Sequence, residues 1–84
     1  MKRIRWSIHA LKNLDDREID REEAEKTLAE PELVALSQPP RLVFMRRYFD
    51  KILQQDMLLR LVVEETATET VIITVYKTSQ FHKF

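Results

Sequence analysis

The sequence predicts an α+β fold in which two short N-terminal helices pack on one face of a three-stranded antiparallel β-meander. A fourth strand is expected if the N-terminal residues also pair. Two helix N-cap signals lie within residues 1–20, and three stretches rich in β-branched and aromatic residues fill the second half of the chain. Eighty-four residues bury too little surface to form two hydrophobic cores. We therefore expect residues 1–84 to form a single domain.

Each predicted helix starts at a polar N-cap residue. Ser7 is followed by apolar side chains at helical spacing, which predicts a helix over about residues 8–17. Asp20 and Glu23 have the spacing of a capping box, and the second helix is expected to end near Ala29, just before a proline.

The rest of the chain is expected to form a connector and three strands. Residues 32–40 are interpreted as the connector, with Leu33, Val34 and Leu36 covering the edge of the core. The strands follow in the stretches RLVFMRRYF, MLLRLVV and TVIITVYKT. Because the chain has no glycine, two-residue hairpin turns are disfavoured. Longer turns are expected around residues 50–55 and 64–68.

Side-chain alternation assigns the strand residues to two faces. If the last hairpin is centred near Ala67, the face that meets the helices carries Leu59, Leu61, Val63, Val71, Ile73 and Val75. The opposite face then carries Leu58, Arg60, Val62, Ile72, Thr74 and Tyr76. If the first hairpin is centred near residue 53, Arg46 lies across from Arg60. Two like charges at this spacing are destabilising unless an anion lies between them.

The composition excludes several classes of protein. The chain has no cysteine and two histidines, so we expect no disulfide, no thiolate zinc site and no metal or other cofactor. No apolar run has the roughly 20 residues that a membrane span needs, and MKRIRWS does not have the form of a signal peptide. We therefore expect a cytoplasmic protein without a membrane partner.

The net charge is zero, but the charges are unevenly distributed. Residues 1–14 carry four basic side chains and no acid, whereas residues 15–32 carry nine acids and three basic side chains. A neutral chain does not indicate strong nucleic-acid binding overall. An uneven surface can still bind a polyanion on one side.

His9 and Arg17 lie eight residues apart on the first predicted helix and could share one face of it. The positive end of the helix dipole favours a neutral imidazole at His9, which could accept a proton from a ribose 2′-hydroxyl. The alternative is that His9 is a partly buried helix residue. Arg17 could contact a phosphate or pair with neighbouring acids.

Arg60 interrupts an otherwise apolar strand, where a charge is costly unless it is solvated or paired. It could hold a phosphate bidentately, or it could simply lie on a solvated sheet face. The C-terminal sequence TVYKTSQFHKF adds hydroxyl, aromatic and basic groups that suit phosphodiester cleavage: Tyr76, Lys77, Thr78, Ser79, His82 and Lys83. The alternative for these residues is a frayed polar tail.

Several residues occur in the order and spacing of one protein family. They are Ser7, His9, Ala10, Arg17 and Ile19, followed by Pro31-Glu32 and the stretches RLVFMRRYF, LLRLVVEE and TVYKTSQFHKF. This pattern covers nearly the whole chain and resembles a family of small prokaryotic proteins related to the RelE/ParE toxins. Asn13 replaces an arginine of the family pattern, and Phe84 replaces a terminal tyrosine.

The resemblance implies a RelE-like or barnase-like fold, RNase activity and a small antitoxin protein encoded next to this one. The leading hypothesis is a toxin of a toxin–antitoxin system, acting as a metal-independent endoribonuclease on free RNA or at the ribosome. Its proposed catalytic residues are His9, Arg17, Arg60, Tyr76 and Lys83, and its proposed RNA-binding residues are Arg46, Thr74, Thr78 and Ser79.

The alternative is a non-catalytic toxin-fold protein that binds a partner protein, including a ParE-like protein poison. Asn13, Phe84 and the neutral net charge favour this alternative.

Overall fold

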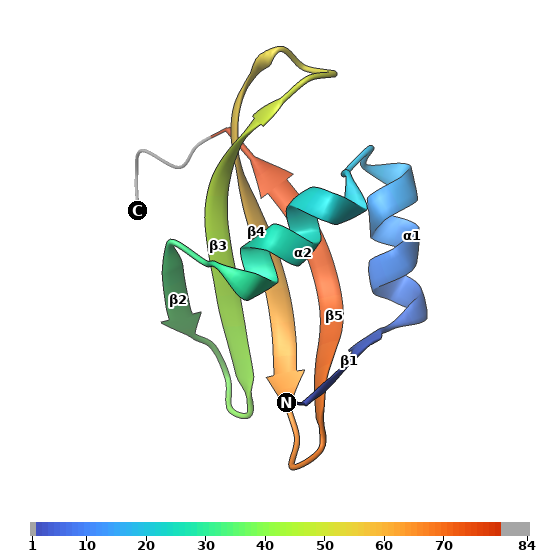
Figure 1. Ribbon diagram of the computed structural model, residues 1–84, viewed down its shortest axis with the longest axis vertical. Coiled ribbons are helices and arrows are strands. Elements are labelled where there is room, and N and C mark those ends of the chain that lie inside the picture. The colour runs from blue at the N-terminus through green and yellow to red at the C-terminus, as the bar shows by residue number, and fades with distance from the viewer. Residues whose placement is uncertain (1, 80–84) are drawn as a thin grey trace.

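The computed structural model describes residues 2–79, which form a mixed five-stranded sheet with two helices packed on it (Figure 1). The elements in chain order are β1 (Arg3–Trp6), α1 (Ile8–Asp16), α2 (Arg21–Ala29), β2 (Leu33–Leu36), β3 (Arg41–Asp50), β4 (Gln55–Glu65) and β5 (Glu69–Thr78). The strands lie side by side in the order β1-β5-β4-β3-β2. The α+β class with two helices is confirmed, but the sheet has five strands instead of three or four.

The strands missing from the predicted meander lie at the two edges of the sheet. β1 runs parallel to β5, so the expected fourth strand exists but is not antiparallel. The segment interpreted as a connector contains β2, which pairs antiparallel with β3. Leu33, Val34 and Leu36 do not cover the core edge as predicted, because they remain 50%, 45% and 88% exposed. They belong instead to the edge strand β2.

The helices begin at the predicted caps. The Ser7 hydroxyl accepts a hydrogen bond of 3.0 Å from a first-turn N–H of α1, and the Asp20 carboxylate accepts one of 2.9 Å in α2. The Glu23 carboxylate lies 3.7 Å from the Arg46 guanidinium instead of closing a capping box. Within residues 2–79, neither helix has the length or the apolar composition of a membrane span.

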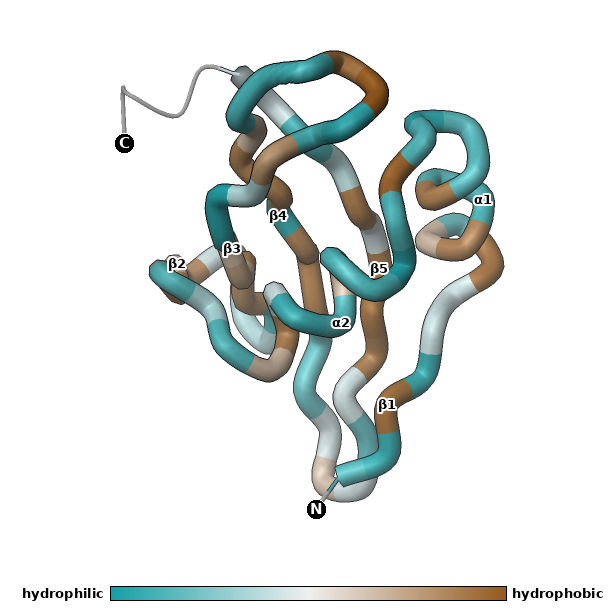
Figure 2. The backbone as a smooth tube through the Cα atoms, turned by 45° about the horizontal axis from the view of Figure 1, so that its top comes forward, coloured by the Kyte–Doolittle hydropathy of each residue, from teal (hydrophilic) through white to brown (hydrophobic). Residues whose placement is uncertain are grey.

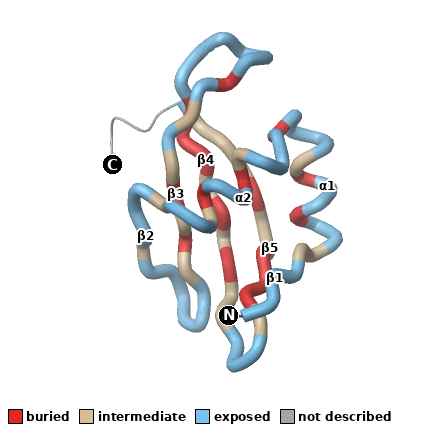
Figure 3. Tube along the Cα trace, in the orientation of Figure 1, coloured by how far each residue is buried: buried red, intermediate tan, exposed pale blue. Residues whose placement is uncertain are grey.

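The main core lies between the helices and the central strands β4 and β5 (Figure 3). Hydrophobic segments run along both strands in Figure 2. The buried strand residues are Leu59, Leu61, Val63, Ile72 and Val75, which pack against Ala10, Ile19 and Ala24. Burying one large aliphatic side chain contributes about 1.5–3 kcal/mol. The predicted helix-facing side of Leu59, Leu61, Val63 and Val75 is confirmed.

A β-bulge overturns the predicted faces of three β5 residues. The register of β4 and β5 shifts between Val62 and Val63. Because a one-residue shift exchanges the two faces of a strand, Ile72 faces the helices and Val71 faces away, the reverse of the prediction. Ile73 falls in the bulge itself, and no glycine marks its position in the sequence.

The register of β3 and β4 places Arg46 on the helix side of the sheet. Arg46 is opposite Leu59, whereas Arg60 is opposite Met45. The two arginines therefore lie on opposite faces, and the predicted pairing of Arg46 with Arg60 is wrong. The hairpin is centred slightly earlier than expected, and this small displacement is enough to exchange the faces.

A buried ion pair joins the β3–β4 turn to β5. The Lys77 ammonium lies 2.6 Å from an Asp50 oxygen, and the two side chains are only 11% and 4% exposed. The Tyr48 hydroxyl donates to the same oxygen (3.1 Å), and two N–H groups of the turn donate to the other. Burial alone would raise the pKa of Asp50, but Lys77 and the turn hold it below its ordinary value. Burial and the Asp50 charge raise the pKa of Tyr48.

Replacing Lys77 should destabilise the fold, because Lys77→Met leaves the Asp50 carboxylate buried without a counter-charge. We expect a loss of about 3 kcal/mol in the free energy of unfolding at pH 7, against less than about 0.5 kcal/mol for the exposed control Lys51→Met. The pKa of Asp50 is lower in the folded protein than in the unfolded chain. The ion pair therefore stabilises the protein at pH values above the pKa of the unfolded carboxyl group. Its contribution disappears as the pH falls through the folded pKa. Urea unfolding across this range tests both effects, and equal midpoints for the two variants at pH 7 would contradict them.

Candidate functional site

Four predicted site residues lie together on the sheet face that points away from the core helices, here called the outer face. Arg60 of β4 is opposite Tyr76 of β5, and its guanidinium carbon lies 5.3 Å from the centre of the Tyr76 ring. Thr74 and Thr78 lie two positions before and after Tyr76 and therefore share its face. The outer face thus presents a cation, a phenol and two hydroxyls on adjacent strands.

Helix α1 is anchored to the edge of β5 by two polar side chains. The Ser7 hydroxyl donates to the carbonyl of Ile73 (2.9 Å) while it caps the helix. The Asn13 side-chain oxygen accepts a hydrogen bond of 3.1 Å from the Val75 N–H, and Asn13 is buried. Asn13 therefore satisfies a backbone donor that would otherwise be buried without a partner. The amide at position 13 therefore has a structural role.

His9 lies one helical turn before Asn13 on α1, and Arg17, the C-cap residue, lies one turn after it. The three residues form one stripe along the helix and its C-cap. This stripe follows the edge of β5 beside Val75, whose neighbours Thr74 and Tyr76 point to the outer face. His9 and Arg17 are exposed, and within residues 2–79 neither forms an ion pair. His9 is therefore not the partly buried helix residue that the sequence left open.

Three other predicted site residues are not part of this group. Arg46 lies on the helix side of the sheet and contacts Glu23. Ser79 is exposed just after the end of β5. Lys83, like His82 and Phe84, lies outside the described residues.

Arg47 lies on the outer face but was not selected from the sequence. It is opposite Leu58 and donates two side-chain hydrogen bonds, of 3.3 and 3.2 Å, to the Glu32 carboxylate. These bonds lower the pKa of Glu32. The aromatic side chains of Phe44 and Tyr48 pack on the core, so alternation along β3 could have assigned Arg47 to the outer face.

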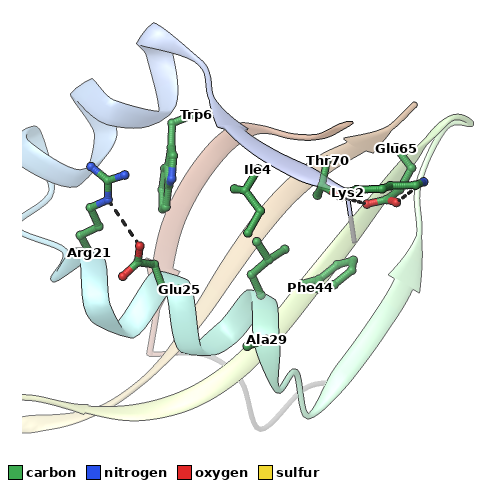
Figure 4. Close-up of a pocket in the computed structure, with 10 residues that line it drawn as sticks. Lys2, Ile4, Trp6, Arg21, Glu25, Ala29, Phe44, Glu65 and Thr70 are labelled. Carbon is green, nitrogen blue, oxygen red and sulfur yellow. Dashed lines mark hydrogen bonds and ion pairs between the residues drawn. The ribbon is translucent and has the colours of Figure 1, made fainter. Parts of the chain in front are cut away.

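A groove of about 800 Å³ opens between β1 and α2 on the helix side of the sheet (Figure 4). Its apolar lining consists of Ile4, Trp6, Leu28, Ala29 and Phe44. The Lys2–Glu65 ion pair (2.8 Å) lies at one end, and Arg21 and Glu25 (3.7 Å) lie at the other. Arg21 also lies over the Trp6 ring at 4.9 Å. The groove and the outer face are separate surfaces, on opposite sides of the sheet.

The described part of the chain contains no group of three or more His, Asp or Glu side chains that could hold a metal ion.

Replacing Asn13 should destabilise the protein more than replacing its exposed neighbours on the stripe. Asn13→Ala leaves the buried Val75 N–H without an acceptor, and we expect a loss of about 2 kcal/mol in the free energy of unfolding. His9→Ala and Arg17→Ala should each change it by less than about 0.5 kcal/mol. Chemical denaturation followed by circular dichroism measures all three. Similar losses for the three variants would show that Asn13 does not anchor α1.

Comparison with known families gives one match that spans most of the chain. Residues 6–77 match the model described as Domain of unknown function (DUF4258). Neither the curated proteins nor the solved structures give a match. The matched range extends from Trp6 at the end of β1 to Lys77 near the end of β5, so it includes both helices and all other strands. This chain therefore belongs to the DUF4258 family, a family of domains of unknown function.

Proposed function

We propose that this protein is the toxin of a toxin–antitoxin system, related in fold to RelE/ParE, and that it cleaves RNA without a metal ion. The observation that carries the proposal is the juxtaposition of two groups of residues. His9 and Arg17 follow the edge of β5 on α1, and Arg60, Tyr76, Thr74 and Thr78 lie on the adjoining outer face.

The chemistry of the proposed reaction is attack by a ribose 2′-hydroxyl on the neighbouring phosphodiester. The His9 imidazole takes the proton from the 2′-hydroxyl, and the 2′-oxygen forms a bond to phosphorus. The bond from phosphorus to the 5′-oxygen breaks, and Tyr76 gives its proton to that oxygen. The products are a 2′,3′-cyclic phosphate and a 5′-hydroxyl. His9 and Tyr76 then recover their starting states by exchanging protons with water.

The cationic side chains of the site would stabilise the negative charge that grows on the phosphorane. Arg60 lies on the central strand and can offer a planar pair of N–H donors to phosphate oxygens. Arg17 approaches from the end of α1, and the hydroxyls of Thr74 and Thr78 add further donors. Ser79 follows these residues in the sequence and stays a predicted RNA-binding residue, and Lys83, which lies outside the described residues, stays a predicted catalytic residue.

Cleavage of RNA by the purified protein tests this proposal. The protein should cleave RNA with EDTA present, either alone or with added ribosomes, and leave 2′,3′-cyclic phosphate ends. His9→Ala should lower the rate at least about 100-fold, because it removes the proton acceptor. Arg60→Ala should also lower the rate, and Arg60→Lys should restore only part of it because lysine lacks the planar donor pair.

Arg46→Ala is the matched control, because Arg46 lies next to this region in β3 but faces the helices. It should cleave RNA at the wild-type rate. Absence of cleavage in every assay, or full activity in both His9→Ala and Arg60→Ala, would refute the mechanism. Expressing the protein with and without the adjacent small gene tests the antitoxin partner, since rescue of growth arrest is the expected result.

A second candidate function is binding of a partner protein without catalysis. The apolar groove between β1 and α2 favours it, because exposed concave apolar surfaces are typical of binding sites. Growth arrest with intact cellular RNA would favour a ParE-like protein poison. Harmless expression together with stable binding of the adjacent gene product would favour an inactive toxin-fold protein.

A further inference from the structure

Strand β2 presents an unprotected backbone edge. It is the last strand of the sheet on its side, and no described strand lies beyond it. The Ser37 N–H donates to the Arg41 carbonyl, and Leu36 is opposite Leu42. Because backbone groups alternate in direction along a strand, this pattern points the N–H and C=O groups of Val34 and Leu36 away from β3.

The side chains of Val34 and Leu36 are the second exposed feature of this edge. They lie opposite Phe44 and Leu42 on the helix side of the sheet, and they are 45% and 88% exposed. Edge strands usually carry a charge, a proline or a bulge that prevents pairing with other chains. The strand sequence LVAL has no charged residue and no proline. Apart from its short length of four residues, this edge therefore lacks the usual protection against strand addition.

We propose that a second copy of this chain pairs with β2 about a two-fold axis through Ala35, which joins the two sheets edge to edge. Val34 then lies opposite Leu36 of the second copy, and their outward backbone groups form four hydrogen bonds. On the helix side of the joined sheets, Phe44 and Val34 of one copy form a continuous apolar row with Leu36 and Leu42 of the second copy. The two-fold axis generates a second, identical row. On the outer face, Ala35 of one copy lies opposite Ala35 of the other.

Self-complementarity favours a second copy over an unrelated strand. Both residues with outward backbone groups carry exposed apolar side chains, and the symmetric register places them opposite each other. It also brings Glu32 opposite Gln38, so no like charges meet. The net charge of zero produces no strong repulsion between copies. This inference does not depend on RNA cleavage.

Disulfide trapping tests the register directly, because the chain has no cysteine of its own. In the proposed pair Ala35 faces its copy at a non-hydrogen-bonded position, with Cα atoms about 4.5 Å apart. This separation suits a disulfide. Ala35→Cys should therefore form a covalent dimer under mild oxidation, much faster than the control Ile52→Cys, which is 62% exposed on the β3–β4 turn. Adding Leu36→Lys to Ala35→Cys should abolish the dimer.

Sedimentation velocity over a concentration series provides the second measurement. The unmodified protein should shift from monomer to dimer as its concentration rises, whereas Leu36→Lys should stay monomeric with an unchanged circular dichroism spectrum. Cross-linking of Ala35→Cys no faster than Ile52→Cys would overturn the proposal. A protein that stays monomeric at every concentration, or pairs through β2 only with a different protein, would also overturn it.

Discussion

The position of α1 depends on two side-chain hydrogen bonds to the edge of β5. β1 pairs with β5 only as far as Ile72, and Ser7 and Asn13 bind the next backbone groups of that edge. Ser7 also caps α1, so one hydroxyl fixes both where the helix begins and where it lies. Ala10 is thereby held in the core, while the side chains of His9 and Arg17 remain exposed. The same contacts that complete the sheet edge thus set the geometry of the candidate site.

Local signals predicted the helices and the central strands well. Caps and apolar spacing act over a few residues, and Ser7 and Asp20 start their helices where expected. The long apolar strands were also evident, since β4 is hydrophobic enough to identify the centre of the sheet. What failed was pairing between distant segments. β1 meets a strand more than sixty residues away, and β2 is only four residues long. Neither segment has a local pattern that identifies its partner.

Register had the largest effect on the predicted site. Arg60, Thr74 and Tyr76 were assigned to the outer face correctly, because side chains alternate regularly along β4 and along the part of β5 that follows the bulge at Ile73. Arg46 was assigned to the wrong face, because a small error in the centre of a hairpin exchanges the faces of a whole strand. The buried amide of Asn13 and the buried ion pair of Lys77 were not anticipated either. Both residues acquire their roles from contacts with chain segments distant in sequence.

We propose that the outer face beside α1, and not the groove on the helix side, is the functional surface. Backbone amide NMR shifts during titration with a short RNA blocked by 2′-O-methyl groups test this claim most directly. We expect shift changes at His9, Arg60 and Tyr76, with Ile4 and Phe44 of the groove unaffected. Changes confined to the groove, or none anywhere at saturating RNA, would contradict it.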